Sequence, residues 1–376
     1  QAQIISQEAA ASPYMIDTYA DLMDRLEREG LLNREIEFLP SSDDMAQRSR
    51  EGHGMSRPEI AVLLSYAKMS LTEHLIVSDL PDDPHFVDDL LGYFPDPIVD
   101  RFGELILAHP LRRELIATIV ANQVLYSQGS TFYSRLRTLT GSSAAMIVRA
   151  YRIARRVTNA SDRWAAVEAL GSTISPEMTR EMLQDIDRLV TIVTRWYLIR
   201  PSERSIDEEI DVAASDFEAL SKGLPEIDDP EWQAPYLRVA RDLVDGGVPE
   251  ELAARHAFQR VLRRGPDMVD LAHIYGRDAL DVAALYTRAS RIFYLGWLER
   301  QIRALPETLD QAQRDEHRGG GGFDGRVPRR DGTAAIAAPS PQEKPAEDRH
   351  VEVAEDAVEA LLDLGQAGLH RPVQVR

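Results

Sequence analysis

The chain has 376 residues, 44% of them apolar, and a formal net charge of −19, so it is long enough to bury a sizeable core. This acidity argues against a binder of nucleic acids or anionic membranes, because both need a surplus of Lys and Arg. Cysteine is absent, which excludes disulfides and thiolate sites and fits a reducing compartment. No apolar run approaches the roughly 18 residues of a membrane span, and no signal-peptide pattern opens the chain. The sequence therefore predicts a soluble cytoplasmic protein.

Helix signals dominate the first third of the chain. Ser12 and Pro13 precede apolar residues at spacings of three and four, and Gly30 closes this segment. Ser56 and Glu59 have the spacing of a capping box at the start of a second helix. The acidic stretch 78–84 lacks the spacing of a calcium loop, and it is typical of a helix end followed by an N-cap.

The same periodicity continues further along the chain. Pro110 precedes one predicted helix, Ser175 and Pro176 start another that should run to about Trp196, and residues 278–305 should form a single long helix. Alternating β-type runs are nearly missing. The tryptophans fall on apolar helix faces and are expected to be core anchors: Trp164, Trp196, Trp232 and Trp297. We therefore predict an all-α fold, a multi-helix array.

Composition divides this array from a C-terminal tail. Two helical lobes are predicted at 1–200 and 201–306, because a polar stretch separates them. Residues 307–376 contain a single aromatic residue, a glycine run and many Pro, Arg and Ala, so they are predicted to be disordered low-complexity sequence. An exception is a short helix near 351–364, whose apolar residues share one face. A frameshift in GC-rich coding sequence would also give this tail composition.

Two short motifs and the histidines give no evidence of a cofactor, catalytic or metal site. Residues 320–325 match G-x-G-x-x-G, but a dinucleotide loop needs a buried strand before it and a helix after it, so we predict no cofactor site there. Ser65 and Lys68 match S-x-x-K without the companion motifs of that enzyme class, so a structural role is expected, and an enzyme using this pair remains a weak alternative. The histidines form no metal-binding pattern, and no metal site is predicted.

A weak candidate for an anion site lies at the predicted helix start near residue 110. His109, Arg112 and Arg113 could meet a carboxylate or phosphate there, since helix N-termini favour anions. The alternative is that these side chains pair internally with acidic neighbours such as Asp96, Asp100 or Glu104.

Long irregular segments carry the most specific signal in the chain. They are LNREIEFLPS (32–41), GMSRPEIAVLLSYAK (54–68), SDLPDDPHF (78–86), YFP (93–95), HPLRRELIAT (109–118), TRWYLIRP (194–201), GVPEELA (247–253) and WLERQIRALP (297–306). In this order, they resemble the C-terminal region of the large bacterial NAD-dependent glutamate dehydrogenases. The sequence departs from that pattern at LYSQG (125–129) and again after Pro306.

The resemblance implies a role inside a larger enzyme. The whole protein would be a homo-oligomer that oxidatively deaminates L-glutamate to 2-oxoglutarate and ammonia with NAD, in glutamate catabolism. The catalytic part lies upstream of the matching segments in that family, and none of its catalytic or NAD-binding residues has a counterpart here. The chain contains only three lysines, whereas the family's chemistry uses lysines to hold glutamate. We therefore expect a structural or regulatory region that binds no NAD by itself and whose partner is the catalytic part of the same enzyme. The alternative is a free-standing helical interaction module.

Overall fold

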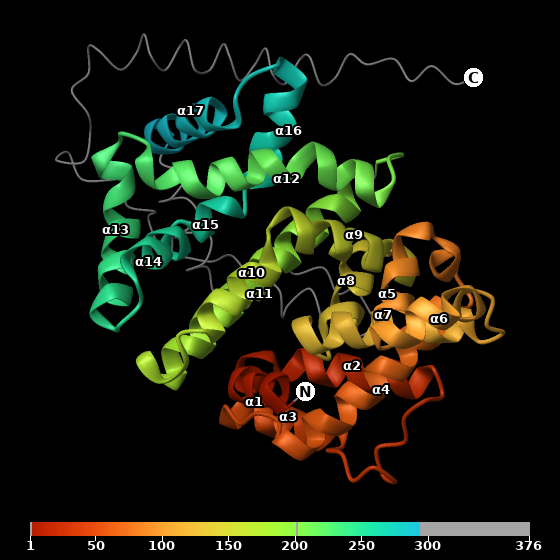
Figure 1. Cartoon of the computed structure of the whole chain (residues 1–376). Coiled ribbons are helices and arrows are strands. Elements are labelled where there is room, and N and C mark those ends of the chain that lie inside the picture. Colours follow the sequence, from red (N-terminus) through yellow and green to blue (C-terminus); the bar gives the residue numbers. More distant parts are fainter. Residues whose placement is uncertain (1, 201, 294–376) are drawn as a thin grey trace, which may run out of the picture. The chain divides into compact units, whose positions relative to one another are not determined.

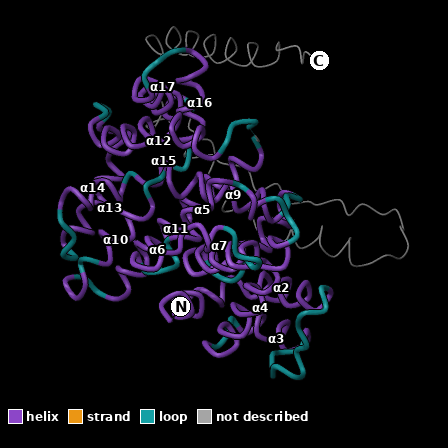
Figure 2. Tube along the Cα trace, turned by 45° about the vertical axis from the view of Figure 1, so that its right-hand side comes forward, coloured by secondary structure: helices purple, strands orange, loops and turns teal. Residues whose placement is uncertain are grey.

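The computed structural model describes residues 2–200 and 202–293, and in this part of the chain every regular element is a helix (Figures 1 and 2). The prediction of an all-α fold is confirmed. The predicted tail at 307–376, the short helix near 351–364, the glycine motif at 320–325 and Trp297 lie outside the described residues. Contacts divide the chain into one compact unit, Gln1–Ala283, and a second that starts at Ala284; of the second, the structure describes residues 284–293.

The helices follow one another with short connections. The first group comprises α1 (Ala2–Ala11), α2 (Ile16–Arg28), α3 (Ser42–Glu51), α4 (Arg57–Ile76), α5 (Val87–Leu91), α6 (Asp96–Leu107), α7 (Arg112–Gln128) and α8 (Phe132–Thr140). The second comprises α9 (Ala144–Val157), α10 (Ala160–Glu168), α11 (Pro176–Ile199), α12 (Ile206–Gly223), α13 (Pro230–Asp245), α14 (Glu250–Ala257), α15 (Gln259–Leu262), α16 (Gly265–Tyr275) and α17 (Ala279–Ile292). Short 3-10 turns join several of them: η1 (Ser12–Met15), η2 (Leu80–Asp82), η3 (Pro84–Phe86), η4 (Gly171–Thr173) and η5 (Leu224–Glu226).

Side-chain caps begin two of the helices whose starts the sequence predicted, α4 and α11. The Ser56 amide donates to Glu59 Oε2 at 2.7 Å, and the Glu59 amide donates to Ser56 Oγ, so the predicted capping box opens α4. Ser175 caps α11, which continues to Ile199. After α4 ends, Asp83 accepts a hydrogen bond from the His85 amide at 3.1 Å, which confirms the helix end and N-cap predicted for the acidic stretch 78–84.

A close approach of two segments explains why α2 begins later than Pro13. Ser12 is buried in η1, and its Oγ accepts a hydrogen bond from the Met55 amide at 2.7 Å. The chain passes so close here that a Cβ on Gly54 would lie 2.8 Å from the Pro13 nitrogen. Only glycine fits this contact without a shift of the backbone. The 3-10 turn at residues 12–15 therefore docks on the segment before α4, and α2 starts at Ile16.

The core is a stack of helices that are far apart in the sequence. α4 packs on α7, α9 packs on α11, and α12 packs on α9 (Figure 1). These helices, together with α2, η3 and α8, bury large side chains with almost no exposure: Tyr19, Met23, Ile60, Leu63, Leu71, Phe86, Phe132, Tyr151 and Phe217. Each such side chain contributes about 1.5–3 kcal/mol through burial. Since α12 packs on α9 within the single unit Gln1–Ala283, the two-lobe division near residue 200 stays a prediction.

Candidate functional site

The first helix is held in the protein body by a buried carboxylate. Glu8 lies on the inner face of α1, and its Oε1 accepts hydrogen bonds from the Ser130 amide at 2.7 Å and the Ser130 hydroxyl at 2.8 Å. Burial raises the pKa of Glu8, and the bonds from Ser130 oppose this effect. Burial also raises the pKa of Tyr19, beside the same carboxylate. Because Ile4 is buried one turn earlier, α1 is a packed element.

A glycine makes room for this carboxylate. Gly129, in the connection between α7 and α8, has φ = +87°, and a Cβ at this position would lie 2.6 Å from Glu8 Oε1. A larger residue would therefore meet both backbone strain and a clash with the carboxylate. The segment 125–129, where the sequence departs from the family pattern, is the end of α7 with its C-cap glycine, and this glycine contacts α1.

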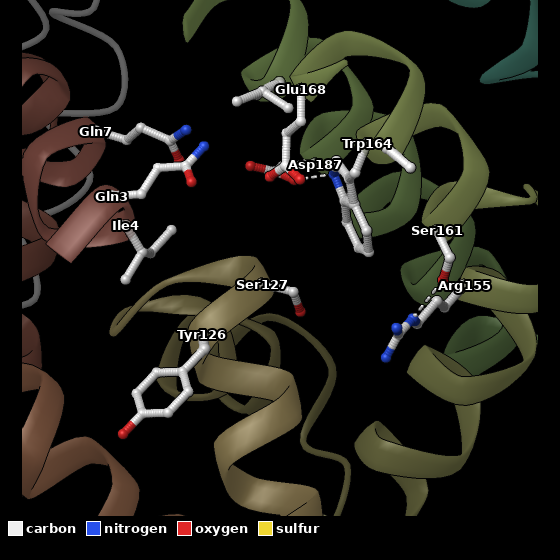
Figure 3. Close-up of a pocket in the computed structure, with 12 residues that line it drawn as sticks. Gln3, Ile4, Gln7, Tyr126, Ser127, Arg155, Ser161, Trp164, Glu168 and Asp187 are labelled. Atoms are coloured by element: carbon white, nitrogen blue, oxygen red, sulfur yellow. Dashed lines mark hydrogen bonds between the residues drawn. The ribbon is translucent and has the colours of Figure 1, made fainter. Parts of the chain in front are cut away.

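Beside α1 lies an open cavity of about 320 Å³ between α1, α7, α9, α10 and α11 (Figure 3). Its walls combine amides, a hydroxyl, an indole and charged groups; the lining residues that matter here are Gln3, Gln7, Arg155, Trp164, Glu168 and Asp187. A second, larger opening of about 660 Å³ is also lined by Gln3 and Gln7 and reaches η4 and the start of α11. Gln3 and Gln7 of α1 therefore line both openings.

Asp187 is the most strongly perturbed carboxyl of the cavity. Its Oδ1 accepts a hydrogen bond from Trp164 Nε1 at 2.9 Å. Burial raises the pKa of Asp187 to about 7, and the indole N–H alone acts against this shift. Near neutral pH the group is therefore divided between its neutral and charged forms. Figure 3 shows Glu168 on the same side of the cavity, with the Gln3 and Gln7 side chains opposite it on α1.

Arg155 adds a positive charge on the other side of the indole. Its guanidinium carbon lies 5.6 Å from the centre of the Trp164 ring, within cation–π range, and its Nε donates to Ser161 Oγ at 3.2 Å. Trp164 is half-buried and forms a wall of the cavity between Arg155 and Asp187. Trp232 is also half-buried, and its ring lies tilted against Phe258 with the ring centres 5.5 Å apart. The sequence predicted core anchors, whereas Trp164, Trp196 and Trp232 are all half-buried.

The cavity has the chemistry of a polar binding pocket. Within residues 2–200 and 202–293, no group of three or more His, Asp or Glu side chains could hold a metal ion. Every helix in those ranges also falls short of the length and apolarity that a membrane crossing requires.

The Ser65 hydroxyl, on an exposed face of α4, donates to the Ala61 carbonyl at 3.0 Å. This bond fits the structural role predicted for Ser65.

The three residues of the predicted anion site have different environments. Arg113 forms an ion pair with Asp82, and its Nη2 donates to the carbonyls of Ile76 at 2.9 Å and Ser78 at 2.6 Å. Arg113 thus pairs internally with an acidic residue, as the alternative interpretation expected, and this residue is Asp82 after α4 rather than Asp96, Asp100 or Glu104. His109 is exposed, and its Nδ1 accepts from the Leu111 amide at 3.1 Å.

Arg112 lies half-buried at the first position of α7. An anion site built from His109, Arg112 and Arg113 stays a prediction, in which the charge of Arg113 is already balanced by Asp82. The contacts that hold the cavity together, from Glu8 to Ser130 and from Trp164 to Asp187, were not identified from the sequence. The only sign of the first contact was a lone acidic residue in an otherwise uncharged helix.

Fold and cavity together define an all-helical region with an internally anchored first helix and a polar pocket beside it. The model of the family described as "Glutamate dehydrogenase, C-terminal" matches residues 52–312, and the chain belongs to this family.

Three curated relatives agree with this membership, and each is named NAD-specific glutamate dehydrogenase. The protein from Pseudomonas aeruginosa is 34% identical over 312 residues, which cover 81% of this chain and 19% of the relative. That from Halomonas elongata is 32% identical over 305 residues, with the same two shares. The relative from Mycobacterium tuberculosis is 29% identical over 287 residues, which cover 76% of this chain and 18% of the length of that relative. The chain thus spans about a fifth of the length of these relatives.

Proposed function

We propose that this chain is the helical, non-catalytic C-terminal region of an NAD-specific glutamate dehydrogenase. The whole enzyme would convert L-glutamate, NAD and water to 2-oxoglutarate, ammonia and NADH. Similarity to the relatives over 76–81% of this chain supports the assignment. The glutamate and NAD sites would then lie in the four-fifths of the relatives that this chain does not match. We also infer a cytoplasmic homo-oligomer.

The observation that carries the structural part of this proposal is the anchoring of α1. Its Glu8 carboxylate is held by Ser130, which follows α7, and Ile4 is buried against the same body. A chain that enters through a packed helix is fixed in direction, whereas a Gly/Ser linker would leave it free. We infer that the catalytic part docks directly on the surface around α1, with the openings beside Gln3 and Gln7 at the contact.

The experiment for the first part is an assay of the purified chain with glutamate and NAD. NADH should not accumulate with this chain alone, and the full-length enzyme provides the positive control. NADH production by the chain in the absence of any other protein would overturn the non-catalytic assignment.

Docking is tested separately, by thermal unfolding of the chain with and without the separately produced catalytic part. Binding to the folded chain should raise its melting temperature with the concentration of the catalytic part. Glu8→Ala should abolish this rise, and Leu139→Ala, in an exposed position of α8, should retain it. A melting temperature that is the same with and without the catalytic part would favour the free-standing interaction module.

A further inference from the structure

Helix α6 turns an apolar face away from the protein. Ile98, Phe102 and Leu105 follow one another at the spacing of one helical face, and they are 41%, 37% and 67% exposed. In this helix only Ile106 is buried, and α6 packs mainly on the short helix α5. In Figure 1, α6 lies beside α5 and the start of α7.

Two further exposed apolar side chains flank α6 along the chain. Tyr93 is 64% exposed before the helix, and Leu111 is 54% exposed after it. Single exposed apolar side chains are ordinary, but five within residues 93–111 make this stretch a candidate interaction surface. We call Tyr93, Ile98, Phe102, Leu105 and Leu111 the α6 face.

The charges beside the α6 face have a twofold arrangement. The guanidinium carbon of Arg101 lies 5.1 Å from the centre of the Phe102 ring, at the edge of the face. Glu104 follows one turn later on the same flank and is exposed. If two copies of α6 pack antiparallel about an axis between residues 102 and 103, each Arg101 lies opposite Glu104 of the partner subunit. Two equivalent ion pairs then form across the axis.

The charges at the two ends of α6 also favour antiparallel packing. Asp96 and Asp100 lie in the first half of α6, and His109 and Arg112 follow its last turn. Antiparallel packing brings the acidic end of one copy to the basic end of the other, and it also opposes the two helix dipoles. Parallel packing would place like charges side by side.

From this geometry we propose that the α6 face is a contact between two copies of this chain, packed antiparallel about a twofold axis near Phe102. A stable interface buries about 800 Å² on each partner, and five partly exposed side chains supply only part of that area. The contact should therefore be weak by itself and dissociate on dilution. It does not depend on the assignment to a dehydrogenase.

The absence of cysteine permits a direct test in the 376-residue chain. Phe102→Cys places a thiol next to the proposed axis, where helices about 8–10 Å apart bring equivalent residues within disulfide range. Mild oxidation should give a covalent dimer that is reversed by reductant. Leu139→Cys, 59% exposed on α8, is the matched control and should remain monomeric. Equal dimer yields from both variants would overturn the proposal.

Charge reversal distinguishes specific dimerisation from nonspecific hydrophobic association. In sedimentation equilibrium, Arg101→Glu and Glu104→Arg should each weaken the dimer about tenfold, because two ion pairs become repulsive contacts. The double variant should restore most of the wild-type affinity, and circular dichroism should show equal helix content in all of them. A wild-type chain that stays monomeric at the highest concentration tested, or a double variant as weak as the single ones, would refute antiparallel pairing. Loss of catalytic-part binding on Phe102→Glu, with a monomeric wild type, would assign the α6 face to that part instead.

Discussion

Replacing Asp187 with asparagine should stabilise the protein above neutral pH. In the folded chain burial raises the pKa of this carboxyl from 3.8 to about 7, whereas the unfolded chain leaves it near its ordinary value. Between about pH 4 and pH 7 the folded state therefore holds a proton that the unfolded state has released, and the wild-type free energy of unfolding falls as the pH rises through this window. The asparagine introduced by Asp187→Asn has no charge at either end of this window, and its amide oxygen can still accept the Trp164 N–H.

The size of the effect follows from the pKa difference. Each pKa unit corresponds to about 1.4 kcal/mol, so the full shift of about 3 units corresponds to about 4 kcal/mol. The carboxylate faces a cavity that is open to solvent, which screens its charge, so we expect about 1–2 kcal/mol. Asp187→Asn should thus change stability little at about pH 3.5, where the carboxyl is protonated in both states, and raise the free energy of unfolding by this amount at about pH 8.

Urea unfolding followed by tryptophan fluorescence at the two pH values measures this difference. Glu168→Gln is the matched control, because Glu168 lines the same cavity but is exposed; it should show the same stability difference from wild type at both pH values. If Asp187→Asn is no more stable than wild type at about pH 8, or if its advantage is equal at both pH values, burial of a charged carboxylate is the wrong explanation.

Three further substitutions test the packing. Glu8→Ala should lower the free energy of unfolding by about 2 kcal/mol, because a buried amide loses its acceptor, and limited proteolysis should then remove the first helix before the rest is cut. Ser56→Ala should cost about 1 kcal/mol in urea unfolding through loss of the cap, whereas Ser65→Ala on the exposed face of α4 should cost almost nothing; equal costs would contradict the capping argument. Gly54→Ala should lower the melting temperature by several degrees because of its contact with η1, while Gly103→Ala, in an open helical position, should raise it slightly.

Local signals predicted the helices well because a cap is a short-range interaction. Ser56, Ser175 and Asp83 each bond a backbone amide within three residues, so the sequence alone identifies them. The helix after Pro110 begins two residues later, at Arg112, because a turn stabilised by His109 intervenes. These helix boundaries are set by hydrogen bonds between residues that are close in the sequence.

The site could not be predicted in the same way. Glu8 and Ser130 are 122 residues apart, and no periodicity links them. Arg113 bonds Asp82 across the corner between α4 and α7, although acidic residues closer in sequence were available. The raised pKa of Asp187 depends on how deeply the packing of several helices buries the carboxyl. Each of these features comes from the tertiary packing.

The fit between Glu8 and Gly129 has an evolutionary consequence. Since a Cβ at position 129 would lie 2.6 Å from Glu8 Oε1, the two positions cannot change independently. We expect homologues with a side chain at position 129 to carry a shorter residue at position 8, and homologues that retain the glutamate to retain the glycine. Positions 8 and 129 would then covary. An alignment of the family would thereby reveal the contact between α1 and the connection after α7 even without a structure.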